Sequence, residues 1–336
     1  MNFMNFGAQL PGATELGLIY AVAALGVYLT FRVLDFPDLT VDGSFTTGAA
    51  TGAVLISSGT PPIVALIVAF LAGAVAGAIT GLLHTKGKIN GLLASILMMI
   101  ALYSINLHIM DGKANVPLLG IDTIFTPLEN AGFMRNSWTG SLILAAWVLL
   151  LVVVLVGFLH TRLGLSLRAT GDNEQMSGSF RVSTDGQKIL GLALSNGLVA
   201  VSGALMAQYN GAADITSGIG LIVIGLASVI VGQALFGQRR VWQAVLAAAL
   251  GAVIYRWVLQ LAMAVGLDPA DLKLASAVIV VAALLLPRLS FVKNLRANRA
   301  RTKQEDALAD LVDATDEPHP ATVMPAGAET KGQSNA

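Results

Sequence analysis

The sequence predicts an all-α, polytopic membrane protein, and three observations support this fold class. Apolar residues make up 55% of the 336 residues and charged residues only 12%, whereas a soluble domain carries about 25% charged residues. Nine apolar stretches are long enough, or nearly so, to cross the roughly 30 Å hydrocarbon core of a bilayer. The 35 Gly residues, with only 6% aromatic residues, are typical of closely packed membrane helices.

The predicted spans fall into five before a long polar loop and four after it. Stretches 62–83 and 138–159 are the clearest, because a helix needs about 20 residues to cross the hydrocarbon. Stretch 44–57 is short and rich in Gly, Ser and Thr, so we expect a broken or re-entrant helix there, shielded from lipid by protein. Nine spans are preferred within a range of eight to ten. They are 16–31, 44–57, 62–83, 91–110, 138–159, 189–209, 215–236, 241–265 and 272–287.

Lys and Arg residues mark one side of the membrane, as they do in cytoplasmic loops. With nine spans, the basic loops at 86–88, 162–188 and 239–240 fall on one side, together with the basic segment after the last span. This places the N terminus outside and the C terminus in the cytoplasm, at a bacterial inner membrane. Residues 1–15 carry no Lys or Arg, so we expect the first helix to be retained rather than removed as a signal peptide.

The composition changes after the last span. Residues 1–287 are predicted to form one transmembrane domain. Residues 288–336 begin with a basic run and continue as a polar tail that is predicted to be cytoplasmic and disordered. The basic run is expected to contact anionic membrane lipid, or to act only as a positive-inside anchor.

Composition and motifs also exclude several classes of function. The 20 basic and 20 acidic residues cancel, so no net charge favours nucleic acid as a partner. The absence of Cys excludes disulfides, Cys-ligated zinc and thiol catalysis. No G-x-x-x-x-G-K-[ST] motif, nucleophile elbow or metal-ligand cluster occurs. We therefore expect no catalytic residue, no metal and no cofactor, and no ATP hydrolysis by this chain itself.

A weak internal repeat relates the two halves of the chain. Residues 38–43 (Asp-Leu-Thr-Val-Asp-Gly) resemble 214–219 (Asp-Ile-Thr-Ser-Gly-Ile), and the Leu-Ala-Ser sequence at 93–95 recurs at 274–276. Because one span lies between the two units, the second unit is expected to be upside down relative to the first. Inverted repeats are typical of transporters, in which substrate passes at the interface between repeats. The alternative is chance similarity between common residues.

Polar residues inside the spans are candidates for a solute pathway. Asp, Gly, Ser and Thr before and within the second span can cap a helix and leave backbone groups free at a break. The alternative role is hydrogen bonding between helices. The long spans carry almost no ionisable side chains, which argues against a proton- or sodium-coupled carrier. The predicted pathway residues are Asp38, Asp42, Ser44, Thr46, Thr47, Ser95 and Asn196.

Glycines recur at every fourth position on the third span, at Gly73, Gly77 and Gly81. They lie on one face of the helix and allow a second helix to approach closely. We predict a role in helix packing for these residues.

The loop between the fifth and sixth spans, residues 161–186, is the most informative polar segment. Asp172 is expected to cap a short helix that runs to Phe180, and Asp185 to cap the following span. A short polar helix on the cytoplasmic face, between two repeats, suits docking onto a partner protein. The alternative is a plain solvated connector.

Three segments resemble the permease subunits of ATP-binding-cassette (ABC) importers, in the branched-chain amino acid and ribose permease superfamily. They are Gly-Leu-Ser-Leu-Arg-Ala-Thr-Gly-Asp-Asn-Glu at 164–174, Leu-Thr-Val-Asp-Gly-Ser at 39–44 and Lys-Ile-Asn-Gly-Leu-Leu-Ala-Ser at 88–95. Residues 35–45 are most similar to a subgroup associated with tryptophan, tyrosine or other amino acids. Asp38 and Asp42 depart from the sugar permeases, which disfavours a sugar without establishing an amino acid as the solute.

The resemblance implies an importer permease that works with other subunits. It implies two ABC ATPase subunits at the cytoplasmic face, an extracytoplasmic substrate-binding protein, and a second permease copy that is identical or related. ATP binding closes the ATPases, and a coupling helix transmits the motion to the spans. The alternative function is a stand-alone secondary carrier or channel for a small solute. The resemblance assigns ATPase coupling to Gly171, Asp172, Asn173, Glu174, Gln175 and Met176.

Overall fold

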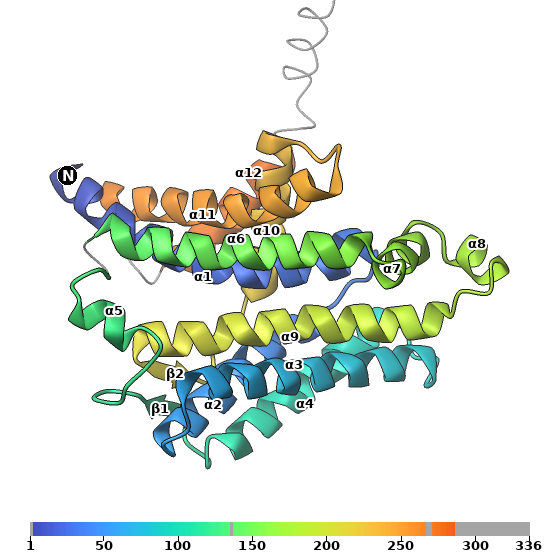
Figure 1. Ribbon diagram of the computed structural model, residues 1–336, viewed down its shortest axis with the longest axis horizontal. Coiled ribbons are helices and arrows are strands. Elements are labelled where there is room, and N and C mark those ends of the chain that lie inside the picture. Colours follow the sequence, from blue (N-terminus) through green and yellow to red (C-terminus); the bar gives the residue numbers. More distant parts are fainter. Residues whose placement is uncertain (1–2, 135–136, 267–270, 286–336) are drawn as a thin grey trace, which may run out of the picture. The chain divides into compact units, whose positions relative to one another are not determined.

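The computed structural model describes residues 3–134, 137–266 and 271–285, and these residues are mainly helical (Figure 1). Each of the nine predicted spans contains a helix. The first five are α1 (Phe3–Tyr28) with its π-helical end η1 (Leu29–Val33), α2 (Thr40–Ser57), α3 (Pro62–Thr85), α4 (Gly91–Ile109) and α6 (Trp138–His160). The last four are α9 (Thr184–Asn210), α10 (Leu221–Phe236), α11 (Val241–Val265) and α12 (Leu272–Leu285). The tail predicted over residues 288–336 lies outside the described residues.

Six of these helices are long and apolar enough to cross a membrane within the described residues, namely α1 with η1, α3, α4, α6, α9 and α11. The other three are shorter or more polar: α2 has 18 residues, α10 has 16 and α12 has 14. The all-α polytopic fold is therefore confirmed. The break expected within 44–57 is wrong, because α2 is one continuous helix from Thr40 to Ser57, and residues 34–39 before it are the non-helical connection from η1.

Local sequence explains where several helices begin and end. Pro62 occupies the first position of α3, where the missing N–H costs nothing. Asn90 and Ser137 cap α4 and α6 by accepting hydrogen bonds from Leu92 N and Thr139 N. Gly211 ends α9 with a left-handed backbone conformation that glycine adopts without strain.

Loops that were predicted to share the outer side meet at one end of the transmembrane domain. Strand β1 (Asn115–Pro117) pairs antiparallel with β2 (Ala212–Asp214), and the short helix α5 (Thr126–Asn130) belongs to the same loop as β1. At the other end lie α7 (Arg162–Asp172) and α8 (Glu174–Ser179), in the loop predicted to be cytoplasmic (Figure 1). These small elements were not predicted individually, apart from the helix that corresponds to α8.

Helix packing follows the two predicted repeats. α3 packs along α9, and its counterpart α11 packs along α1, so each third helix of one unit lies on the first helix of the other (Figure 1). Within each unit, α2 packs on α3 and α10 packs on α11. This exchange of helices is the arrangement expected for an inverted pair of structural repeats.

The matched segments of the repeat also share one local hydrogen bond, and the first helices of the two units run in opposite directions. Asp38 Oδ1 accepts from Thr40 N at 2.9 Å, and Asp214 Oδ1 accepts from Thr216 N at 2.6 Å. The first helices of the two units run antiparallel, because Ser195 Oγ of α9 donates to Gly26 O of α1 and Ser202 Oγ donates to Ile19 O. The two units are thus inverted, as the sequence predicted.

Large apolar side chains are exposed along the outward faces of the peripheral helices. An apolar surface of this extent suits lipid rather than water. Examples are Ile63, Leu71 and Val75 on α3, Leu97 and Ile100 on α4, and Leu142, Leu150 and Val153 on α6.

Candidate functional site

The chain enters α2 through a buried polar turn. Besides its bond from Thr40 N, Asp38 accepts a hydrogen bond at Oδ2 from Asn196 Nδ2 of α9, at 2.7 Å. Ser44 Oγ donates to Asn196 Oδ1, also at 2.7 Å. All four residues are fully buried. Three predicted pathway residues, Asp38, Ser44 and Asn196, therefore form one hydrogen-bonded group, which we call the α2–α9 junction.

Asp42 and Thr46 contact a different helix. Asp42 accepts hydrogen bonds from Gly220 N at 3.0 Å and from Ile222 N at 2.8 Å. Thr46 Oγ1 accepts one from Gly218 N at 3.2 Å. No side chain of its own caps the start of α10, so Asp42 supplies the carboxylate that stabilises its first turn. The second helices of the two repeats, α2 and α10, thus begin side by side.

Thr47 and Ser95 belong to neither arrangement. Thr47 Oγ1 donates to Gly43 O within its own helix at 2.9 Å. Ser95 Oγ donates to Leu92 O at 2.9 Å and has a longer contact of 3.5 Å with Pro37 O. The pathway role of the seven residues stays a prediction.

Thr40 and Thr80 extend the α2–α9 junction and were not identified from the sequence. Their Oγ1 atoms lie 2.9 Å apart, which joins the start of α2 to α3. The one feature of the sequence that could have indicated this contact is the position of Thr80 next to Gly81 of the glycine stripe. That signal is weak, because a helical Thr often bonds its own backbone, and Thr80 Oγ1 also reaches Ala76 O at 3.2 Å.

Two carboxylates are buried in the transmembrane domain, contrary to expectation. Neither Asp38 nor Glu15 has exposed surface, and Tyr209 Oη donates a hydrogen bond to Glu15 Oε2 at 2.9 Å. Glu15 escaped notice because α1 begins earlier than the predicted span, and Asp38 because its turn folds into the protein. The charge pattern therefore gives no argument against an ion-coupled carrier.

The predicted glycine stripe of α3 lies against α9. A Cβ atom added to Gly73, Gly77 or Gly81 would come within 2.4 Å of Asn196 O, 2.2 Å of Leu192 O and 2.8 Å of Ile189 Cα, respectively. Only glycine allows the two backbones to approach this closely. The stripe thereby holds Asn196 next to the start of α2.

The predicted coupling residues lie where α7 meets α8. Asp172 is the last residue of α7, and Asn173 caps α8 by accepting a hydrogen bond from Met176 N at 2.9 Å. Likewise Ser183 caps α9, whereas Asp185 lies inside its first turn. Both expected caps are therefore displaced, because a cap must precede the helix with a non-helical backbone.

The six predicted coupling residues differ in their surroundings. Gly171 packs on η1, and a Cβ atom there would lie 2.0 Å from Val33 O. The other five form an exposed stretch, Asp172, Asn173, Glu174, Gln175 and Met176.

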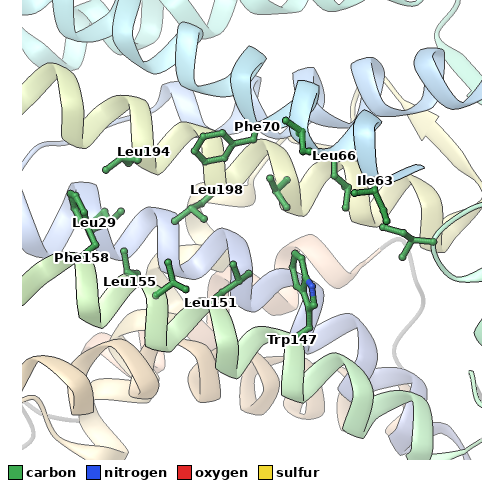
Figure 2. A pocket seen from close by; sticks show the side chains of 14 residues that line it. Leu29, Ile63, Leu66, Phe70, Trp147, Leu151, Leu155, Phe158, Leu194 and Leu198 are labelled. Carbon is green, nitrogen blue, oxygen red and sulfur yellow. The ribbon is translucent and has the colours of Figure 1, made fainter. Parts of the chain in front are cut away.

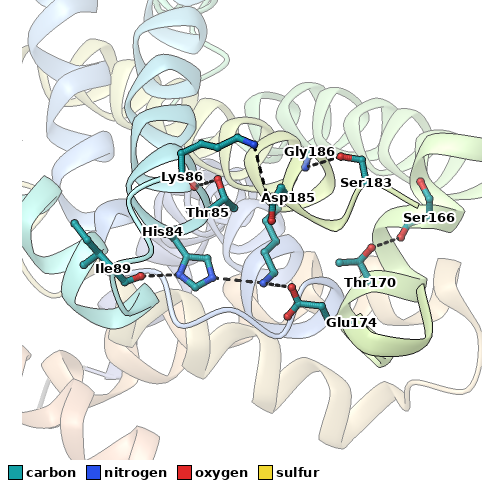
Figure 3. A network of polar contacts seen from close by, with 12 residues as sticks. His84, Thr85, Lys86, Ile89, Ser166, Thr170, Glu174, Ser183, Asp185 and Gly186 are labelled. Carbon is teal, nitrogen blue, oxygen red and sulfur yellow. Dashed lines mark hydrogen bonds and ion pairs between the residues drawn. The ribbon is translucent and has the colours of Figure 1, made fainter. Parts of the chain in front are cut away.

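A network of polar contacts joins α8 to α9 and to the end of α3 (Figure 3). Lys188 Nζ lies 2.5 Å from Glu174 Oε1 and 3.5 Å from His84 Nε2. A second pair, Lys86 Nζ and Asp185 Oδ2, is separated by 3.7 Å. Two basic loops that the sequence placed on one side therefore do lie together.

An apolar cavity of about 720 Å³ opens between α3, α6 and α9 (Figure 2). Phe70, Trp147, Leu151 and Leu198 are among its lining residues, and no charged side chain lines it. Such a lining suits hydrocarbon rather than a zwitterionic solute. Within the described part of the chain, no group of three His, Asp or Glu side chains could hold a metal ion.

The fold and its inverted repeats define a multi-pass membrane transport protein. The family model described as the permease component of branched-chain amino acid transport systems matches residues 12–286, so the chain belongs to that family of ABC transporter permeases.

Two relatives agree with this assignment by sequence. The chain is 43% identical to the tyrosine transport system permease protein of Clostridioides difficile strain R20291, over 81% of this chain and 89% of the relative. It is 29% identical to the ribose import permease protein of Bacillus subtilis strain 168, over 69% and 68% of the two chains. A solved ABC transporter chain in an inward-facing conformation gives a TM-score of 0.46 at 18% identity, over 83% of this chain and 84% of that one.

Proposed function

We propose that this chain is the permease subunit of an ABC importer for an amino acid or a similar small solute, driven by separate ATPase subunits. The observation that carries the proposal is α8, an exposed helix at the end of the domain where the basic loops meet. Met176 and Phe180 expose 58% and 72% of their surface there. Exposed apolar side chains amid polar neighbours are typical of a protein-binding surface.

The orientation and remaining partners follow from the same proposal. The α7–α8 end faces the cytoplasm of the inner membrane, which leaves the N terminus outside and the β1–β2 end to receive a substrate-binding protein. A second permease copy completes the pathway. The relative named for tyrosine transport shares more sequence with this chain than the relative named for ribose import, which favours an amino acid.

The predicted pathway residues keep a more specific role in the proposal. The starts of α2 and α10 meet at Asp42, close to the α2–α9 junction. Half-helices that begin inside a transporter commonly flank its substrate pathway. We place the solute path beside this meeting point.

Reconstitution with its ATPase subunits and a substrate-binding protein tests the function. We expect uptake of a radiolabelled amino acid such as tyrosine into proteoliposomes only when all subunits and ATP are present. Uptake by this chain alone, without ATPase subunits, would contradict the proposal.

A variant of α8 tests the docking surface. Met176→Asp replaces an exposed apolar side chain, so the fold should persist while co-purification of the ATPase subunits is lost. Leu119→Asp is the matched control, because Leu119 is 91% exposed at the opposite end. Equal recovery of the ATPases with both variants would show that α8 is not the docking surface.

A further inference from the structure

We propose that Lys188 and His84 are positioning residues that link movement of α8 to the start of α2, an inference that rests on the proposed function. The link runs from Glu174 through Lys188 and His84 to Phe36, which lies two residues before Asp38. Through this link, movement of α8 caused by the ATPases would shift the α2–α9 junction.

The first step joins α8 to α9. Glu174 is the first residue of α8, and its carboxylate lies 2.5 Å from the Lys188 ammonium. The Lys188 side chain is only 14% exposed, whereas that of Glu174 is 51% exposed. A largely buried ammonium is held more tightly by its partners than a surface one, because leaving it unpaired is costly. Displacement of α8 therefore pulls on Lys188.

The second step joins Lys188 to the end of α3. His84 Nδ1 lies 2.8 Å from Ile89 O, so Nδ1 carries the proton and donates it to that carbonyl. His84 Nε2 faces the Lys188 ammonium at 3.5 Å, and in the neutral ring its lone pair accepts a hydrogen bond from that ammonium (Figure 3). The imidazole thus connects Lys188 to the loop between α3 and α4.

The third step reaches the segment that precedes α2. The ring of Phe36 packs edge-on against His84, with centroids 5.1 Å apart. Phe36 is buried, and a Cβ atom on Gly91 would lie 2.6 Å from its Cε2. The ring is therefore enclosed between the end of α3 and the start of α4. A shift of His84 moves Phe36 and, two residues on, Asp38.

The pair Lys86–Asp185 provides an internal comparison. It joins the end of α3 to the start of α9, as His84 and Lys188 do, at 3.7 Å, but its side chains are 72% and 48% exposed. Exposed pairs of this kind contribute little, because solvent screens them. Among the residues that the structure describes, no hydrogen bond or ring contact connects this pair to the side chains of His84 or Phe36. The two ion pairs are thus similar in charge and lie at the same end of the domain, but only Lys188–Glu174 is in contact with His84 and, through it, with Phe36.

The experiment measures uptake and ATP hydrolysis in the same proteoliposomes, using the complete complex. Lys188→Met and His84→Leu should leave ATPase assembly and hydrolysis in place. The number of solute molecules transported per ATP should fall about tenfold, within the range of coupling between sites in other proteins. Lys86→Met, the matched control, should keep the wild-type ratio.

A double variant tests whether the two residues act in one chain of contacts. If they do, Lys188→Met combined with His84→Leu should lower the ratio no further than either change alone, whereas independent effects would multiply. If Lys188→Met prevents assembly of the complex, the variant His84→Gln tests the link instead. It keeps an acceptor for Lys188 and removes the ring against Phe36, so the ratio should again fall.

The outcomes separate this inference from the proposed function. Absence of ATP-dependent uptake in the wild-type complex would count against the function itself. Normal wild-type coupling with an unchanged ratio in the Lys188 and His84 variants, or multiplied losses in the double variant, would overturn the inference alone.

Discussion

At the scale of single residues, Asp38 shows how an acidic side chain is accommodated inside a membrane protein. Its oxygens accept hydrogen bonds from Thr40 N and Asn196 Nδ2, and Asn196 is further fixed by Ser44. Buried polar groups of this kind are costly when one partner is removed, because the remaining donors lose their bonds. The α2–α9 junction is therefore a stabilising feature as well as a candidate part of the pathway.

Replacement of Asp38 tests this stabilising role. Asp38→Ala leaves Thr40 N and Asn196 Nδ2 without their acceptor, so we expect a loss of about 3 kcal/mol in unfolding free energy. Asp38→Asn keeps one acceptor and should lose less. The thermal unfolding midpoint of the purified protein in detergent measures both effects.

Asp111→Asn is the control for this series. Asp111 is exposed and has a positive φ of 57°, which Asn also tolerates. A midpoint for Asp38→Ala as high as that of Asp111→Asn would show that the junction contributes nothing to stability.

The residue scale also shows which signals in the sequence were ambiguous. Lys188 served only as one of several basic residues that mark a side of the membrane, and no motif in the sequence singled out His84. Their contacts with Glu174 and Phe36 bring together segments that are far apart in the chain. No local pattern encodes such a meeting, so only the folded chain could reveal it.

At the scale of elements, the close contact of α3 with α9 organises the first unit. It depends on Gly73, Gly77 and Gly81, whose spacing predicted a packing face but not the partner helix. α9 was predictable as a span, yet its position among α1, α2 and α3 depends on tertiary packing.

A single added methyl group tests this contact. Gly77→Ala would place Cβ 2.2 Å from Leu192 O, so α3 and α9 must separate. Overpacking costs about 1–3 kcal/mol in protein cores, and a clash with backbone should reach the upper part of that range. We expect a clearly lower unfolding midpoint in detergent and a lower yield of monodisperse protein.

Gly157→Ala is the matched change on α6. No heavy atom lies within 4 Å of the added Cβ, so stability should stay within about 1 kcal/mol of wild type. If the two alanine variants unfolded alike, tight packing of α3 on α9 would be refuted.

At the scale of the whole molecule, the inverted repeat sets which segments share a side. Paired β1 and β2 bring together two loops from opposite halves of the chain, while α7 and α8 lie at the other end. The positive-inside pattern then predicts which compartment each end faces.

The absence of Cys makes this orientation directly testable, because a maleimide can react only with the single Cys that is introduced. Leu119→Cys, at the β1–β2 end, should react with a membrane-impermeant maleimide in intact spheroplasts. Phe180→Cys, next to α8, should react only after the membrane is permeabilised. Labelling of both positions from the same side would refute the inversion, and the reverse pattern would refute the proposed orientation.

The sequence by itself determined the membrane fold, a helix within each predicted span and the family. These properties depend on apolar length, loop charge and short local motifs, which can be read without knowing what each segment touches. Tertiary structure alone decided that Asp42 caps α10, that Asn196 holds Asp38, and that Lys188 and His84 lie between α8 and Phe36. Each of these contacts joins residues from different elements, and the packing of whole helices is what brings them within hydrogen-bonding or van der Waals distance.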